Sequence, residues 1–176
     1  AENQTATTSG QASGELTGMK IAYVEIDTLL AQYNFCIDLN EGMVKKSENV
    51  RLTLNQKARE LDKQKQDFQT KYQNNAYLSP ERAQQEYNRI AKLEQDLQTL
   101  SNKLQSELMS ENEKNSLQLR DSINAFLKEY NKTKGYSMII SNTGFDNLLY
   151  ADSIYNITKE IVEGLNARYS SPAPKK

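Results

Sequence analysis

Residues 74–88, "NNAYLSPERAQQEYN", hold Pro80, which is the only proline before residue 172. No Gly or Pro occurs in 43–79 or 81–134, so we expect helix on both sides of Pro80. Ser79 can cap a helix that begins at Pro80, where no needed N–H is lost, and Glu81 adds an acid to its first turn. The residue before a proline avoids the helical conformation, which predicts that the incoming helix ends at this point.

Two interpretations of Pro80 follow. It can kink one continuous helix, or it can restart the helix after the chain has reversed near residues 74–82. We favour the reversal, because a straight helix from 43 to 134 would keep the two ends of the chain far apart.

Apolar residues follow a helical period on both sides of the reversal. Their steps are mostly three and four, which predicts two long helices that meet along a narrow seam. In the helix before the reversal, Lys65 occupies the one seam position that is not apolar. The seam residues are Val50, Leu54, Ala58, Leu61, Phe68 and Tyr72 before the reversal, and Tyr87, Ile90, Leu93, Leu97, Leu100, Leu104 and Leu108 after it.

Strand-like segments occur only near the two ends of the chain. The stretch "KIAYVEI" (20–26) carries β-branched and aromatic residues on both faces, which predicts a strand buried on both sides. Near the other end, "YSMIIS" (136–141) and "LLYAD" (148–152) flank a turn with Gly144, which predicts a β-hairpin. The ends must meet to cover their apolar faces.

Short helices are expected beside these strands. One covers residues 27–33, with Asp27 or Thr28 as its cap, and Gly42 marks a bend after it. The other begins at Asn156 and turns Ile157, Ile161, Val162 and Leu165 inward.

The expected fold is therefore α+β, with a long antiparallel helical hairpin inserted into a small β body. The expected regions are a flexible polar tether (1–18), a strand and short helix (19–42), the helical arm (43–134), a β-hairpin and final helix (135–169), and a disordered tail (170–176).

Composition excludes several kinds of chemistry. The chain has no His and a single Cys, and it lacks phosphate-binding and metalloprotease motifs, so we expect no enzyme, no cofactor and no metal site. Cys36 is either a small buried residue or a reactive or intermolecular thiol. The net charge of -1 argues against nucleic acid as a partner.

Residues 45–71 are locally basic, with eight Lys or Arg against four Asp or Glu. A solvated helix face is the ordinary explanation, and a surface for acidic partners or anionic head groups is the functional one.

Aromatic and basic side chains gather around the reversal. They either close the end of the seam or, as aromatic bodies with polar handles, contact partly unfolded chains. These candidate client-binding residues are Phe68, Lys71, Tyr72, Tyr77, Leu78, Arg82 and Tyr87.

Both ends of the chain resemble one known family. "KIAYVEIDTLL" (20–30) resembles the opening strand and short helix of the Skp/OmpH family of periplasmic chaperones, and "GYSMIISNTGFDNLLYADSIYNITKEIVEGLN" (135–166) resembles that family's closing segment. The residues between these two segments match the family only in their number and in their Lys-, Gln- and Glu-rich composition. The resemblance covers residues 20 to about 168.

The resemblance implies a jellyfish-like homotrimer whose arms surround a cavity. It implies an ATP-independent holdase that binds unfolded outer-membrane β-barrel proteins in the periplasm, with residues 1–18 as an extra segment suited to a membrane tether. It also implies weak membrane or lipopolysaccharide contact through residues 45–71, although the pI near 5.7 departs from the strongly basic family members. The expected oligomer interface comprises Ile21, Tyr23, Val24, Ile26, Met138, Ile139, Ile140, Leu148, Leu149 and Tyr150.

A second hypothesis remains open. Thin seams and an acidic total charge also suit a structural coiled-coil or envelope scaffold that binds folded partners.

Overall fold

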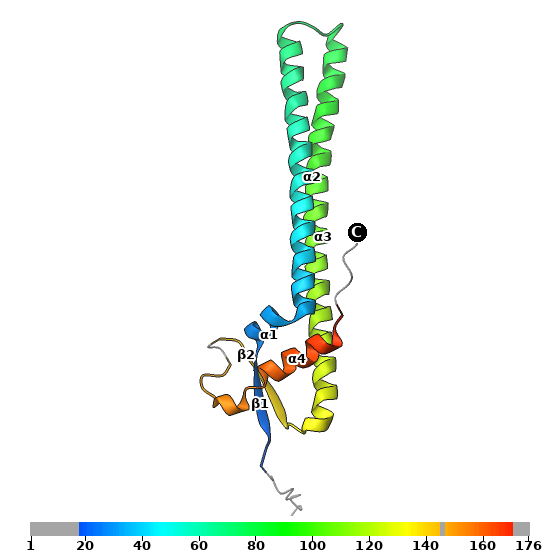
Figure 1. Cartoon of the computed structure of the whole chain (residues 1–176). Helices are drawn as coiled ribbons and strands as arrows, with labels where there is room; N and C mark the ends of the chain where they lie inside the picture. The colour runs from blue at the N-terminus through cyan, green and yellow to red at the C-terminus, as the bar shows by residue number, and fades with distance from the viewer. Residues whose placement is uncertain (1–17, 145–146, 171–176) are drawn as a thin grey trace, which may run out of the picture.

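Two long helices run side by side away from a small mixed body in the computed structural model, which describes residues 18–144 and 147–170 (Figure 1). Helix α2 spans Asn34–Gln73 and helix α3 spans Pro80–Lys134, with 40 and 55 residues. At about 1.5 Å per residue, α2 is roughly 60 Å long and α3 roughly 80 Å long. The predicted reversal near residues 74–82 is therefore confirmed. The outer parts of the two helices form what we call the arm.

The base of the arm differs from the sequence prediction. A short helix, α1, spans Ile26–Gln32, and α2 follows after only Tyr33. The predicted bend at Gly42 is wrong, because Gly42 lies inside α2. The predicted caps Asp27 and Thr28 are also wrong. Both lie within α1, which begins one residue earlier and has no side-chain cap.

The two ends of the chain meet in a two-stranded sheet. Strand β1 (Ile21–Glu25) pairs in parallel with strand β2 (Met138–Asn142), in a register that places Tyr23 opposite Ile140. Two parallel strands need a long connection between them. Here helices α1, α2 and α3 form that connection. Residues 22–24 are buried, as predicted for the first strand. Strand β2 is only half-buried, with Met138 45% exposed.

The predicted β-hairpin is wrong in its second half. Residues 148–152 form no strand, so β2 has β1 as its only neighbour in the part of the chain that the structure describes. Asp152 instead accepts a hydrogen bond from the Ile154 backbone N–H and caps a 3-10 helix, η1, at Ser153–Tyr155. This local bond competes with an extended backbone at the end of the predicted strand. Leu149 and Tyr150 are left 87% and 85% exposed.

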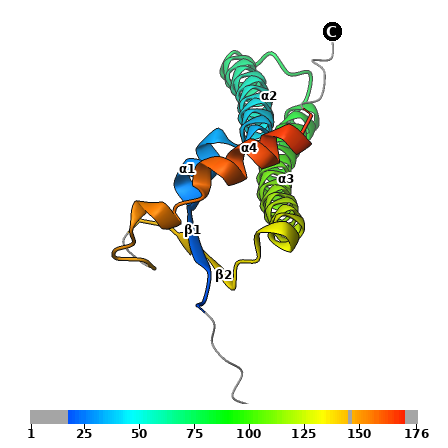
Figure 2. The same ribbon diagram turned by 60° about the horizontal axis from the view of Figure 1, so that its bottom comes forward.

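Helix α4 (Thr158–Arg168) closes the body and crosses the lower end of α3 (Figure 2). The prediction that four of its residues face inward is confirmed: Ile157, Ile161, Val162 and Leu165 are buried. Asn156 accepts a hydrogen bond from the Thr158 backbone N–H at 3.0 Å, although Ile157 is the capping residue.

One apolar core joins these elements. It contains residues from β1, α1, the start of α2 and α4, and Cys36 is among them, as the first of its two interpretations predicted. The last turns of α3 pack against this core, so α3 belongs to the arm above and to the body below. The side chains of α3 that do so are Leu119, Ile123, Phe126, Leu127 and Tyr130.

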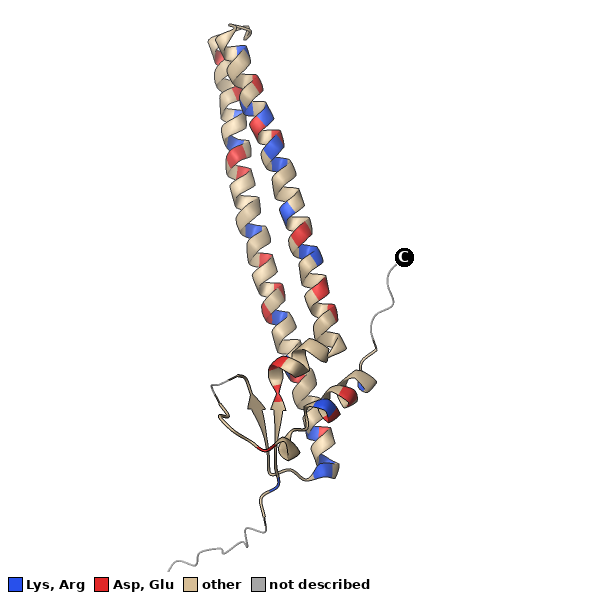
Figure 3. Ribbon diagram, turned by 60° about the vertical axis from the view of Figure 1, so that its left-hand side comes forward, with Lys and Arg blue, Asp and Glu red and all other residues tan. Residues whose placement is uncertain are grey.

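Charged residues of both signs alternate along the two long helices (Figure 3). Two basic side chains of the 45–71 stretch reach across to α3: Lys46 Nζ lies 2.6 Å from Glu111 Oε1, and Lys65 Nζ lies 2.7 Å from Glu94 Oε1. Part of the local positive charge is therefore paired within the arm. These pairs are exposed, so solvent screening leaves them little effect on stability.

Candidate functional site

The free end of the arm, which we call the tip, spans residues 68–90. Helix α2 ends within the tip, at Gln73. Asn75 has a φ of 52°, and the backbone N–H groups of Asn75 and Ala76 donate to the carbonyls of Tyr72 and Lys71. These two bonds satisfy the last carbonyls of the helix in the Schellman arrangement, and Asn tolerates the left-handed conformation that it requires.

This geometry corrects the expected cause of the reversal. Helix α2 ends at Gln73, several residues before Pro80, so the restriction that a proline places on its predecessor does not end it. The adjacent asparagines 74 and 75 were the sequence signal for the stop, and the sequence prediction missed it.

The start of α3 agrees with the prediction. The Ser79 side chain accepts a hydrogen bond from the Arg82 backbone N–H at 3.2 Å, and Pro80 occupies the first helical position. Hydrogen bonds from its own backbone N–H and from Ser79 lower the pKa of Glu81, so its negative charge is retained at the positive end of the helix. The restart is thus built from three consecutive residues, 79–81.

Phe68 is the centre of the aromatic group at the tip. Its ring centroid lies 5.9 Å from Tyr72, 5.7 Å from Tyr77 and 6.1 Å from Tyr87. These separations are those of favourable aromatic pairs. The sequence prediction that these four residues gather is confirmed.

Much of this group is open to water. Tyr72 is 62% exposed, Tyr87 is 56% exposed, and Leu78 in the connecting loop is 96% exposed. A shallow groove of about 380 Å³ runs beside Phe68, between Tyr72 on α2 and Ala83 and Tyr87 on α3. The tip therefore offers apolar surface that residues 18–144 and 147–170 do not cover.

Charged residues border the aromatic group. Hydrogen bonds from Arg89 lower the pKa of Glu86, and the nearby Lys71 ammonium adds to the effect. Arg82 is exposed in the first turn of α3. Lys71 and Arg82 thus stand at the edge of the tip rather than in contact with its centre.

Ala83 and Ile90 anchor the tip, at 8% and 6% exposure. Ile90 was predicted as a seam residue, but Ala83 was not. The spacing of Ala83, Tyr87 and Ile90 by four and three residues could have identified it. A small side chain here lets the two helices approach closely.

The residues predicted to form an oligomer interface lie on the body. Ile26, Ile139 and Ile140 line an apolar groove of about 470 Å³ between the sheet, α1 and α3, and Val24 lies at its floor. Tyr23 and Val24 are only 8% and 3% exposed, because other parts of the same chain already cover them.

The other predicted interface residues differ widely in exposure. Ile21 and Leu148 are partly buried, and Met138, Leu149 and Tyr150 are exposed.

Two further kinds of site are absent from residues 18–144 and 147–170. No group of three or more His, Cys, Asp or Glu lies close enough to hold a metal ion. None of the helices in these ranges is long and apolar enough to cross a bilayer.

Comparison with known proteins identifies the family. A sequence profile described as outer membrane protein (OmpH-like) matches residues 20–165. The chain belongs to the OmpH-like family. No significant match was found among curated proteins.

A crystal structure from Caulobacter crescentus shares the fold of this OmpH-like chain. That protein is described as a candidate outer membrane chaperone (OmpH-like). The TM-score is 0.77 at 12% sequence identity, and the match covers 93% of this chain and 94% of the other. The correspondence therefore includes both the body and the arm.

Proposed function

We propose that this OmpH-like protein is an ATP-independent, non-enzymatic holdase that keeps unfolded outer-membrane β-barrel proteins soluble in the periplasm. The observation that carries the proposal is an exposed aromatic tip on the arm of a chain that belongs to this family. Tyr72, Tyr87 and Leu78 present apolar surface roughly 50 Å from the body, where no other described residue of the chain covers it. Weak contacts of this kind suit clients without fixed structure.

We further propose that three copies assemble through their bodies, so that three arms surround one client. The apolar groove beside Ile26, Ile139 and Ile140, and the exposed Leu149 and Tyr150, supply surface for this assembly. Several weak arm contacts on one client gain strength from their high effective concentration. A tether role for residues 1–18 and a lipid contact through residues 45–71 belong to the same proposal, and residues 1–17 lie outside the described part of the chain.

Aggregation of a diluted client tests the central claim. An outer-membrane β-barrel protein is diluted from urea, with and without this protein at a ratio of one assembled trimer to one client, and light scattering is followed. Suppression of scattering without ATP is expected. Full aggregation of the client, together with capture of folded partners in a pull-down, would instead support the structural scaffold.

Mass in solution tests the assembly separately. Light scattering is expected to give about three times the 20.1 kDa mass of one chain. A mass of one chain would contradict the shared body.

Substitution at the tip tests the assigned residues. Replacement of Tyr72, Tyr77 and Tyr87 by Ser is expected to weaken client binding while the trimer mass is unchanged. The matched variant changes Met109 and Leu117 to Ser, because these lower-arm residues have similar exposure, at 67% and 51%. If only the lower-arm variant loses binding, the holdase function stands but the tip assignment is wrong.

A further inference from the structure

The seam between α2 and α3 has a polar interruption just below the tip. Lys65 and Gln64 occupy the gap between Leu61 and Phe68, at positions where an apolar residue would continue the seam. Lys65 turns to Glu94, which it contacts at 2.7 Å, and the two side chains are 40% and 61% exposed. We call Gln64, Lys65 and Glu94 the polar layer.

Gln64 makes this layer weak. Its Oε1 atom is buried, yet it has no hydrogen-bond partner among the described residues. A buried acceptor without a partner costs free energy that the rest of the seam must offset. The arm therefore loses stability at the position where its apolar contacts are already interrupted.

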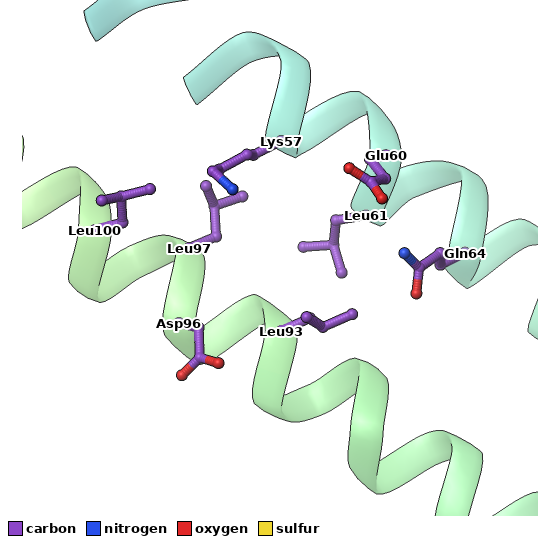
Figure 4. Close-up of a pocket in the computed structure, with 8 residues that line it drawn as sticks. All are labelled: Lys57, Glu60, Leu61, Gln64, Leu93, Asp96, Leu97 and Leu100. Atoms are coloured by element: carbon purple, nitrogen blue, oxygen red, sulfur yellow. The ribbon is translucent and has the colours of Figure 1, made fainter. Parts of the chain in front are cut away.

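A cavity of about 240 Å³ adjoins the layer on its body side. Figure 4 shows Leu61 facing Leu93 and Leu97 across this space, with Gln64 at one end. Side chains that border this space lack contacts on that side, so the seam next to the layer has less contact area than a continuous one. The polar layer and this space therefore lie next to each other on the body side of the tip.

The tip, in contrast, has a small core of its own. Phe68 with its three tyrosines lies above the layer, and Ala83 and Ile90 are buried there. The Asn75 helix stop and the Ser79 cap complete the unit at the far end. The aromatic pairs, the helix stop and the Ser79 cap all lie within residues 66–91 and can form or break together.

We infer that residues 66–91 form a separate unit of local unfolding, which opens and closes while the arm below the polar layer stays paired. The boundary lies at Gln64, Lys65 and Glu94, because a buried unpaired acceptor and an exposed ion pair interrupt the apolar seam there. In the open state, Phe68, Ala83 and Ile90 become exposed. The tip therefore alternates between a closed state with less exposed apolar surface and an open state with more. This alternation is a property of the free protein and does not depend on what the tip binds.

Hydrogen exchange of the intact protein, followed by mass spectrometry of its peptides, tests the boundary. Peptides within residues 66–91 are expected to share one protection factor, with an abrupt rise in protection below the layer. A smooth gradient through residues 64 and 94 would overturn the inference, since simple fraying from the tip produces that result.

A substitution at Gln64 sharpens the test. Gln64→Leu removes the unpaired acceptor and fills part of the cavity, so exchange within residues 66–91 should slow about tenfold as the tip couples to the lower seam. Gln64→Met is a second variant with the same expected direction. The matched control is Gln66→Leu, which makes the same change at an exposed position of α2. Unchanged exchange in both Gln64 variants, or equal slowing in the control, would contradict the proposed boundary.

Discussion

The body and the arm of this chain are stabilised in different ways. In the body, Leu29, Tyr33, Ile161 and Leu165 are each less than 2% exposed, and they come from segments more than a hundred residues apart. Along the arm, Leu61 is 8% exposed, and most other seam residues above the body are half-buried. The body has a three-dimensional core, whereas the arm has a single line of contacts.

This difference has a functional consequence. Two helices that pack only against each other leave most of their circumference in water, so their side chains remain available to other molecules. They also open locally at low cost, since few contacts hold each turn. A rigid body that carries a soft, accessible arm suits the proposed holdase, and the following substitutions measure the contrast.

Truncation of a leucine in each region should give the largest difference. Leu165→Ala in the body is expected to lower the free energy of unfolding by about 3 kcal/mol, because it leaves a cavity in a fully packed core. Leu104→Ala in the arm should cost only about 1 kcal/mol, since this side chain is already partly in water. Urea titration followed by circular dichroism measures both, and equal losses would contradict the distinction.

The two helical glycines provide a second contrast. A Cβ added to Gly164 in α4 would lie 2.3 Å from Cζ of Phe126, so Gly164→Ala should destabilise the body by about 1–3 kcal/mol. A Cβ at Gly42 in α2 meets nothing within 4 Å, so Gly42→Ala should stabilise by about 0.5–1 kcal/mol. The melting temperatures of the two variants should therefore move in opposite directions. A shift in the same direction would show that α4 can move away from α3.

At the tip, the left-handed residue should have a smaller and local effect. Asn75→Ala is expected to cost about 1 kcal/mol, because a φ of 52° is unfavourable for alanine. Asn75→Gly is the control, since glycine adopts this conformation freely. In the alanine variant, hydrogen exchange should become faster near residues 70–80. Exchange in the body should stay unchanged. Loss of protection in the body would mean that the tip and body are more tightly coupled than the structure indicates.

The smallest effect concerns pH and a single ion pair on the body. Lys134 Nζ lies 2.6 Å from Glu160 Oε1 and, together with Tyr130, lowers the pKa of Glu160 from its ordinary value of 4.5. A lowered folded-state pKa means that the stabilisation is present above the unfolded-state pKa and is lost as the pH falls through the folded value. Glu160→Gln should therefore cost less than about 1 kcal/mol near neutral pH, since the pair is half-exposed.

The difference between wild type and Glu160→Gln should shrink as the pH falls below 4.5, and urea midpoints across this range measure it. Glu163→Gln on the same helix is the control, because its nearest cation, Lys159, lies 3.9 Å away. A constant difference at all pH values would show that the carboxylate charge is not responsible.

Local sequence signals predicted the arm well. The seam residues, the Ser79 cap and the Pro80 start depend on neighbours within a few residues, so their pattern can be read directly. The aromatic group at the tip was also predictable, since Phe68, Tyr72, Tyr77 and Tyr87 all lie close to the reversal. Two features were missed, and both carried weak signals. Ala83 is a small side chain whose burial depends on where the two helices meet. The role of Asn75 depends on its left-handed backbone conformation.

The body was harder to predict. Residues 148–152 look like a strand by composition, yet strand formation needs a partner edge, and β2 finds its partner in β1 instead. Gly42 looks like a bend, yet the helix continues through it because packing at the base of the arm outweighs a weak local preference. Nothing local indicated that Gly164 faces Phe126, almost forty residues earlier.

The two long helices and the reversal between them follow from local signals in the sequence, because helical periodicity, capping and turn residues act over a few neighbours. The parallel pairing of β1 with β2 and the entry of the end of α3 into the body were visible only in the folded chain, as was the apolar surface of the tip that the described residues leave uncovered. Those features depend on which distant surfaces meet, and a linear pattern does not record that.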